Sequence, residues 1–84
     1  MKYRILYSKE AEYFIEKLDS KVQKIIVKKI DSLQEKPELG KPLRHDLKKY
    51  RRLRVLKYRI LYEIKNKELL IYVVKIDKRK IVYR

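Results

Sequence analysis

The chain has 84 residues, no cysteine, one histidine and a formal net charge of +14 at pH 7. This length fits one small domain over residues 1–84, and the absence of cysteine excludes disulfides and thiolate metal sites. With no acidic cluster, no membrane-length apolar run and no secretion signal, we expect a cytoplasmic protein that needs neither a metal nor a cofactor.

The first half of the chain predicts one strand and two helices. Residues 1–7 are aromatic and β-branched, as in a strand, and Ser8 is suited to cap a helix. The first helical stripe consists of Ala11, Phe14, Ile15 and Leu18. A capping box beginning at Ser20 then starts a second helix, which ends at Pro37 and Gly40. Its apolar stripe consists of Val22, Ile25, Ile26, Ile30 and Leu33. Two helices joined by so short a break are expected to form an antiparallel hairpin.

The second half predicts a loop and three strands. Residues 36–46 hold the only glycine and both prolines, which is typical of a loop. Strand-like runs follow at 50–55, 57–65 and 68–76, with a tail at 77–84. Lys65-Asn66-Lys67 suits a hairpin turn, whereas Leu56-Lys57 does not, because neither residue favours positive φ. The expected fold class is α+β, ordered β-α-α-β-β-β: a small antiparallel sheet with an N-terminal strand and a helical hairpin on one face.

The positive charge is concentrated in the second half. Residues 1–40 carry nine Lys and Arg against seven Asp and Glu, a net of +2, whereas residues 41–84 carry sixteen against four, a net of +12. Seven of the eight arginines follow Gly40. Arginine presents a planar fork of donors that matches phosphate, and it stays charged at physiological pH. Such a field on a sheet indicates a polyanionic partner, above all nucleic acid.

Strand alternation predicts where these arginines gather. Arg52 and Arg54 share one face of their strand, and Lys57 and Arg59 share one face of the next. If the two strands pair, Arg52, Arg54 and Arg59 converge on the face that the helices leave open. The tail would carry Arg79 and Tyr83 to the edge of this face, where Tyr83 could stack on a base. The plainer interpretation is a solvated basic face.

The usual catalytic groups are absent from the sequence. His45 lies in the polar loop, where a lone histidine is usually exposed, and Glu63, Glu68 and Asp77 are scattered. RNA cleavage requires none of these groups, because RNA carries its own nucleophile, the 2′-hydroxyl beside each phosphate. Convergent Arg and Lys side chains can align that hydroxyl and stabilise the charge that grows on the phosphorane.

The whole chain resembles the RelE/ParE toxin superfamily, and in particular RelE-type mRNA interferases. The matching segments are Leu18-Asp19, Pro42-Leu43-Arg44, residues 52–55, residues 58–64 and residues 78–84. The resemblance implies the fold above and a type II toxin that enters the ribosomal A site. There it would cleave mRNA by 2′-hydroxyl attack, leaving a 2′,3′-cyclic phosphate and a 5′-hydroxyl, and so inhibit translation. It also implies an acidic RelB-like antitoxin that wraps and blocks the toxin in a hetero-oligomer.

The resemblance assigns roles to five side chains. Arg52 and Arg54 would flank the scissile phosphate, Arg59 would stabilise it, Arg79 would protonate the leaving oxygen, and Tyr83 would stack on the RNA. Further RNA contacts are expected from Arg44, Arg51, Lys57, Lys78 and Lys80.

Two points about these roles stay open. Arginine is a poor general base because it stays protonated in proteins, so Tyr83 or Lys57 would have to take the proton if one of these positions must accept it. The run Tyr50-Arg51-Arg52 leaves the register uncertain by one residue, so Arg51 could take the place of Arg52.

Two other functions fit the same pattern. A ParE-like toxin would poison DNA gyrase through protein contacts, without nuclease activity. A non-catalytic RNA-binding module would bind with a steep salt dependence and release no product. The presence of Arg59, Arg79 and Tyr83 together favours the nuclease.

Overall fold

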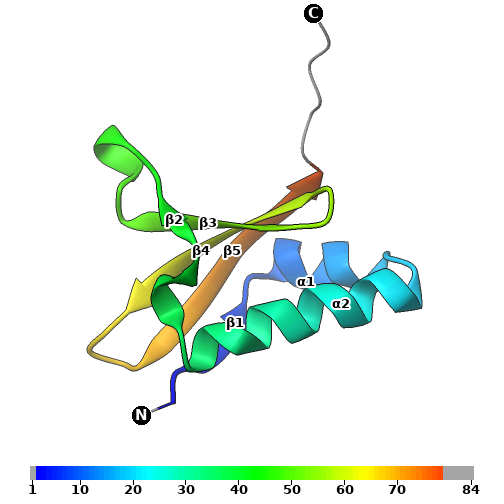
Figure 1. Cartoon of the computed structure of the whole chain (residues 1–84), viewed down its shortest axis with the longest axis horizontal. Coiled ribbons are helices and arrows are strands. Elements are labelled where there is room, and N and C mark those ends of the chain that lie inside the picture. Colours follow the sequence, from blue (N-terminus) through cyan, green and yellow to red (C-terminus); the bar gives the residue numbers. More distant parts are fainter. Residues whose placement is uncertain (1, 79–84) are drawn as a thin grey trace, which may run out of the picture.

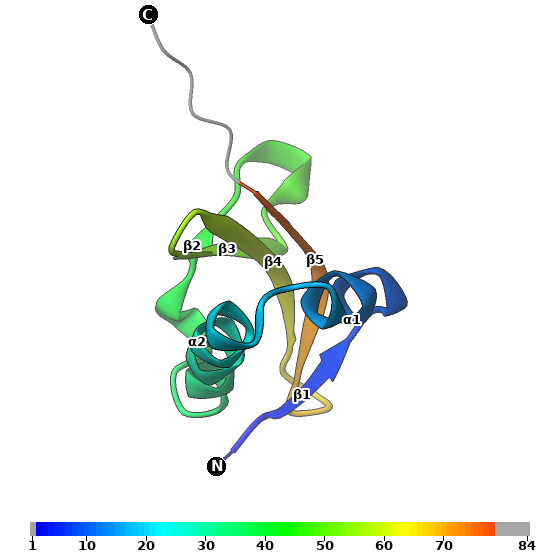
Figure 2. The same cartoon turned by 90° about the vertical axis from the view of Figure 1, so that its right-hand side faces the viewer.

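The described chain, residues 2–78 of a computed structural model, contains one sheet and two α-helices (Figure 1). Its elements are β1 (Arg4–Tyr7), α1 (Lys9–Glu16), α2 (Ser20–Asp31), β2 (Lys41–Pro42), β3 (Tyr50–Val55), β4 (Tyr58–Lys65) and β5 (Leu70–Lys78). Short 3-10 helices occupy Ser32–Gln34, Pro37–Leu39 and His45–Leu47. Both α-helices lie on one side of the sheet (Figure 2). Within residues 2–78 no helix is long and apolar enough to cross a membrane.

The α+β fold class is confirmed, with two differences in the sheet. The strand order is β1-β5-β4-β3-β2, and β1 runs parallel to β5, so the sheet is mixed and not wholly antiparallel. The two helices connect β1 at one edge of the sheet with β2 at the other edge, so β1 and β5 are not joined by a hairpin and are free to pair in parallel. The second difference is β2, which lies in the segment expected to be a loop and pairs with Arg51 and Arg52 at the sheet edge.

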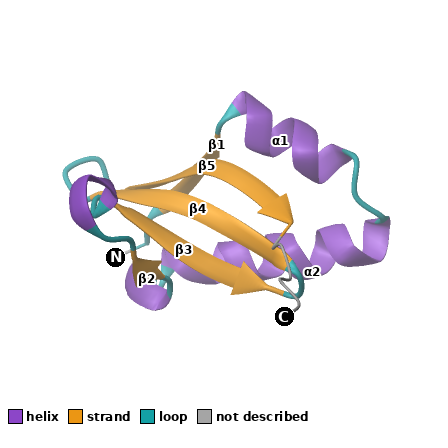
Figure 3. Ribbon diagram, turned by 90° about the horizontal axis from the view of Figure 1, so that it is seen from above, coloured by secondary structure: helices purple, strands orange, loops and turns teal. Residues whose placement is uncertain are grey.

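The helix starts are fixed by side-chain caps. Ser8 caps α1 as predicted: its Oγ accepts from the Ala11 backbone N at 3.0 Å and donates to the Val74 carbonyl at 2.7 Å, which ties α1 to β5. For α2 the cap is Asp19 and not Ser20, since the Asp19 carboxylate accepts from the Lys21 backbone N at 3.2 Å. A carboxylate there also suits the positive end of the helix dipole. The two helices run antiparallel, as expected (Figure 3).

The core lies between the helices and the covered face of the sheet. Ile26, Ile30 and Leu33 are buried as predicted, but Ile25 is 48% exposed and does not belong to the core stripe. Ala11 and Ile15 of α1 are buried as well. The sheet contributes the rest of the core, which consists of Leu53, Val55, Tyr58, Ile60, Tyr62, Ile71, Val73 and Ile76. The inward and outward sides of β3 and β4 therefore agree with the alternation read from the sequence.

Both hairpin turns differ from expectation. Lys65 pairs with Leu70, so the second turn spans residues 66–69 and is longer than Lys65-Asn66-Lys67. The first hairpin closes through Leu56-Lys57 although the pair is poor turn chemistry, and Leu56 adopts a φ of 55°. The buried pairs that flank it, Val55 with Tyr58 and Leu53 with Ile60, outweigh the cost of that backbone conformation.

We expect Leu56→Asn to raise the free energy of unfolding by about 0.5–1 kcal/mol. A left-handed conformation costs an ordinary residue about 1–2 kcal/mol, and asparagine adopts it more readily than leucine does. Little packing is lost, because Leu56 is 55% exposed. Urea denaturation measures the change. Leu56→Val, which is β-branched, should lower stability, and a Leu56→Asn variant no more stable than the parent would contradict the argument.

A buried hydroxyl fixes the segment that carries β2. The Tyr62 hydroxyl accepts from the Gly40 backbone N at 2.8 Å and donates to the Pro37 carbonyl at 2.7 Å. Arg51 Nη1 donates to the Gly40 carbonyl at 2.6 Å, on the far side of the same glycine. The segment is thereby tied to both β3 and β4, and β2 is held against the edge of β3.

One bulge changes the alternation of β5. Leu61 pairs with Lys75 whereas Tyr62 pairs with Val73, so Val74 is an extra residue. Regular alternation from Val73 would turn Lys75 and Asp77 toward the core. After the bulge Ile76 is buried instead, and Lys75 and Asp77 lie on the face that the helices leave uncovered.

Candidate nucleic-acid interface

The uncovered side of β3, β4 and β5, here called the open face, carries a row of charged side chains. Arg52 and Arg54 on β3 alternate with the buried Leu53 and Val55, which fixes their direction. On β4, Arg59 alternates with the buried Tyr58 and Ile60 in the same way. Strand alternation therefore brings Arg52, Arg54 and Arg59 together on one face.

Arg59 lies in the middle of this row. It pairs with Arg54 on β3 and with Asp77 on β5. Its Nε donates to Asp77 Oδ1 at 3.1 Å and its Nη2 donates to Oδ2 at 3.3 Å, a bidentate ion pair. The guanidinium is thus held by one carboxylate while a second arginine faces it from the other strand.

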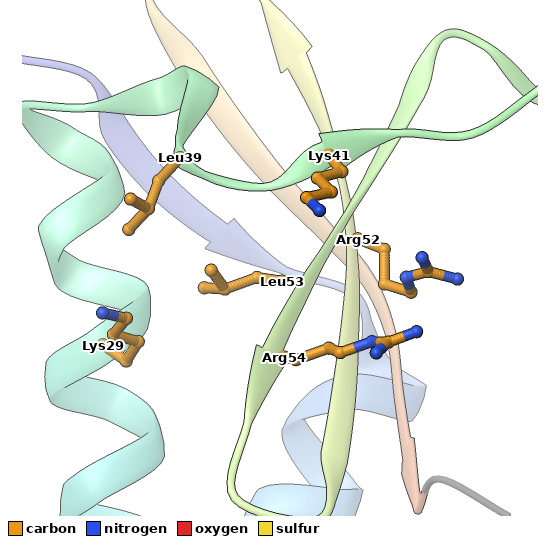
Figure 4. Close-up of a pocket in the computed structure, with 6 residues that line it drawn as sticks. All are labelled: Lys29, Leu39, Lys41, Arg52, Leu53 and Arg54. Carbon is orange, nitrogen blue, oxygen red and sulfur yellow. The ribbon is translucent and has the colours of Figure 1, made fainter.

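Two hollows border the arginines. One, of about 290 Å³, lies on the open face and is lined by Leu43, Arg52, Arg59, Leu61, Lys75 and Asp77. The other, of about 330 Å³, lies at the edge of β3 and is lined by Lys29, Leu39, Lys41, Arg52, Leu53 and Arg54 (Figure 4). In Figure 4 Arg52 and Arg54 extend to one side of β3, and Leu53 points to the other side, toward Lys29 and Leu39. Arg52 is the residue that the two hollows share.

Arg51 lies apart from this set. Arg51 is two residues before Leu53 in β3, so its side chain leaves the strand on the same side as Leu53 and points away from the open face. Its guanidinium binds the Gly40 carbonyl at 2.6 Å and lies 3.8 Å from the Glu38 carboxylate. The geometry therefore places Arg52, and not Arg51, beside the other arginines of the open face.

The remaining predicted contacts are scattered or lie beyond the described residues. Lys57 is exposed at the hairpin turn after β3, Lys78 is exposed at the end of β5, and Arg44 is exposed after β2. None of these three lines either hollow. His45 is exposed, as expected for the loop. Three predicted residues fall outside residues 2–78: Arg79, Lys80 and Tyr83.

The open face combines cations with apolar surface, which suits a phosphodiester chain. Three cations (Arg52, Arg59 and Lys75) and two leucines line the same hollow. Guanidinium groups bind phosphate oxygens in a bidentate manner and stabilise added negative charge on them. In the part of the chain with described side chains, no three His, Cys, Asp or Glu residues gather in a way that could hold a metal ion.

No tyrosine with a shifted pKa is available here as a base. Burial raises the pKa of Tyr7 to about 12, with Asp31 adding to the effect, and burial also raises the pKa of Tyr62. Both phenols face the covered side of the sheet, where they stay protonated. Neither phenol is therefore available to the open face as a base. The cations described there are the guanidinium groups of Arg52, Arg54 and Arg59 and the ammonium group of Lys75, beside the Asp77 carboxylate.

Sequence reasoning missed Lys75 and Asp77 as members of the open face. The signal was present in the spacing of buried residues on β5, which changes from Ile71 and Val73 to Ile76 and so requires one extra residue. Sequence reasoning also did not identify Lys29 as a residue of the hollow at the edge of β3, because the position of Lys29 depends on how α2 packs against the sheet.

Comparisons with known proteins agree with this architecture. The sequence profile of the ParE toxin of the parDE type II toxin–antitoxin system matches residues 2–83. No curated protein matches the chain. Among solved structures, the chain is similar to the toxin–antitoxin complex RelBE2 from Mycobacterium tuberculosis, with 26% identity and a TM-score of 0.84 over 94% of this chain and 100% of that one.

Two further structures share the fold at lower identity. The isolated E. coli RelE toxin is 21% identical, with a TM-score of 0.82 over 95% of this chain and 87% of that one. The archaeal RelE–RelB complex from Pyrococcus horikoshii is 22% identical, with a TM-score of 0.78 over 98% of this chain and 100% of that one.

Proposed function

The chain belongs to the family of ParE toxins of type II toxin–antitoxin systems, within the RelE/ParE superfamily, and we propose that it acts as a ribosome-dependent endoribonuclease. It would cleave mRNA in the ribosomal A site and inhibit translation. The proposal commits to a metal-independent reaction in which the RNA supplies the nucleophile.

The observation that supports this proposal is the row of arginines on the open face. Arg52, Arg54 and Arg59 project from paired strands, and Arg52 and Arg59 line one hollow with Lys75. A solvated face would spread such charges apart, because like charges directly opposite each other in a sheet are destabilising. Arg54 directly opposite Arg59 is therefore an arrangement that a polyanionic substrate would stabilise.

The reaction would proceed by transfer within the RNA. The 2′-oxygen forms a bond to the adjacent phosphorus, and the bond from phosphorus to the 5′-oxygen of the next nucleotide breaks. One proton passes from the 2′-hydroxyl to a base, for which the sequence offers Tyr83 or Lys57, and one is taken up by the 5′-oxygen, giving a 2′,3′-cyclic phosphate and a 5′-hydroxyl. Arg52, Arg54 and Arg59 would bind the phosphate oxygens and stabilise the charge of the phosphorane. By resemblance, Arg79 would supply the proton to the leaving oxygen and Tyr83 would stack on the RNA.

The second candidate is a non-nucleolytic toxin that poisons DNA gyrase. It is favoured by the family description, since the matching profile is that of the ParE toxin. The two candidates share a fold, so they differ in what the open face does. In a gyrase poison the arginines would make protein contacts and RNA would stay intact.

The antitoxin partner is expected to be acidic. The similar solved structures include toxin–antitoxin complexes, among them RelBE2 and the archaeal RelE–RelB complex. Residues 41–84 carry sixteen Lys and Arg against four Asp and Glu, a net of +12. Carboxylates of a RelB-like antitoxin would offset part of this charge, and an amphipathic segment would cover apolar surface beside the sheet, so that toxin and antitoxin form a hetero-oligomer.

The experiment that tests the nuclease uses ribosomes that hold a defined message with an empty A site. Purified protein is added, and primer extension maps the ends of the message. We expect one cut in the A-site codon that does not occur without ribosomes. An intact message, with binding to the ribosome verified, would contradict the nuclease, and cleaved DNA–gyrase complexes would then support the second candidate.

A further inference from the structure

Arg59 has a carboxylate partner that the proposed reaction does not use. Both oxygens of Asp77 accept from it, at 3.1 and 3.3 Å. The side chains are 40% and 38% exposed, so the pair is reached from solvent at the hollow that both residues line. Among the side chains that line this hollow, Asp77 is the one carboxylate, beside Arg52, Arg59 and Lys75.

The geometry of the pair leaves one edge of the guanidinium free. Arginine has five N–H donors, and Asp77 occupies the edge formed by Nε and one N–H of Nη2. The remaining donors are both N–H groups of Nη1 and the second one of Nη2. Their shared edge is a second bidentate site that matches two phosphate oxygens. The Asp77 carboxylate, bound at the first edge, fixes the plane of the Arg59 guanidinium and therefore the direction in which its second edge points.

The neighbours of Arg59 make such a restraint necessary. Arg54 lies directly opposite it and Arg52 lines the same hollow, so Arg59 is repelled from two sides. A long, flexible side chain in this position would otherwise turn outward into solvent. Asp77 opposes that repulsion, and the bulge at Val74 is what brings it to the open face.

We propose that Asp77 is a positioning residue of the RNA-cleavage site, which holds the free edge of the Arg59 guanidinium toward the scissile phosphate. The inference rests on the proposed function and adds a residue to the site. It also explains a carboxylate on a surface that binds a polyanion. Asp77 repels phosphate and so weakens RNA binding, but it aligns the group that stabilises the transition state.

The test is Asp77→Asn, measured as kcat and KM on ribosome-bound message. We expect kcat to fall by about 10²-fold, because a misdirected group loses most of its effect on an aligned reaction. KM should stay unchanged or fall, since a negative charge is removed from the RNA-binding face. The matched control is Glu63→Gln, which removes a negative charge from β4, where Glu63 lies 3.7 Å from Lys65. The control should keep the parent kcat.

A double-mutant cycle separates positioning from any direct role of Asp77. Arg59→Lys keeps the charge but cannot form the bidentate pair, so adding Asp77→Asn to it should change kcat by less than about twofold. Equal losses in both backgrounds, or a parent kcat in Asp77→Asn, would overturn the inference. Circular dichroism confirms that each variant is folded.

A wild-type protein that leaves the message intact would overturn the proposed function together with this inference, whereas an active wild type with an equally active Asp77→Asn would overturn the inference alone.

Discussion

Replacing Arg59 by alanine is expected to reduce kcat for A-site cleavage by about 10²- to 10³-fold while the protein stays folded. This is the usual cost of removing one preorganised donor from the group that stabilises a transition-state anion. Arg59 is the natural choice because it lies between Arg54 and Asp77, with a free guanidinium edge at the hollow. The fold should survive, since an ion pair exposed to this degree contributes little to stability.

Arg4→Ala is the matched control for this experiment. It removes the same charge, but Arg4 pairs with Leu70 at the other end of β5, roughly 20 Å along the strand from Asp77. If RNA affinity alone determined the rate, both variants would lose activity to a similar and small extent through their net charge. Equal activity of the Arg59→Ala and Arg4→Ala variants would therefore contradict the assignment of the open face as the cleavage site.

The arginine row could be predicted from the sequence because it depends on local rules. Alternation places Arg52, Arg54 and Arg59 on one face of their strands, and the apolar residues between them determine which face is buried. The same rules predicted the Ser8 cap and the antiparallel helices. The hairpin at Leu56 shows their limit, because there the burial of flanking side chains outweighed unfavourable turn chemistry.

Features that depend on two distant segments could not be predicted. Asp77 reaches Arg59 only because β5 contains a bulge at Val74. The hairpin turn predicted that β5 lies beside β4, but the bulge depends on how the two strands pack against the core. The strand β2 forms because Tyr62 and Arg51 bind the chain around Gly40, which looked from the sequence like an ordinary loop glycine. The ion pair and the anchored loop thus arise from tertiary packing, whereas the arginines themselves follow from the strand pattern.

Gly40 is the position where the second large effect is expected. Its φ of −77° is open to any residue, so the requirement for glycine is steric and not conformational. A Cβ at this site would lie 2.8 Å from both Cε1 and the hydroxyl of Tyr62 and 2.9 Å from the Arg52 carbonyl. The tyrosine is fully buried and the carbonyl belongs to the β3 backbone, so neither neighbour can move aside easily.

We therefore expect Gly40→Ala to lower the free energy of unfolding by about 3 kcal/mol, which combines overpacking with weakening of the Gly40–Tyr62 hydrogen bond. For a domain of this size the melting temperature should fall by about 12 °C or more. Lys41→Ala, at an exposed neighbouring position, should change stability by less than about 0.5 kcal/mol.

In the Gly40→Ala background, Tyr62→Phe should give no full rescue, because the ring and the Arg52 carbonyl still oppose the new methyl group. A Gly40→Ala protein as stable as the parent would mean that the segment carrying β2 is free to shift, and the hollow shared by Lys41 and Arg52 would then not be a fixed part of the site.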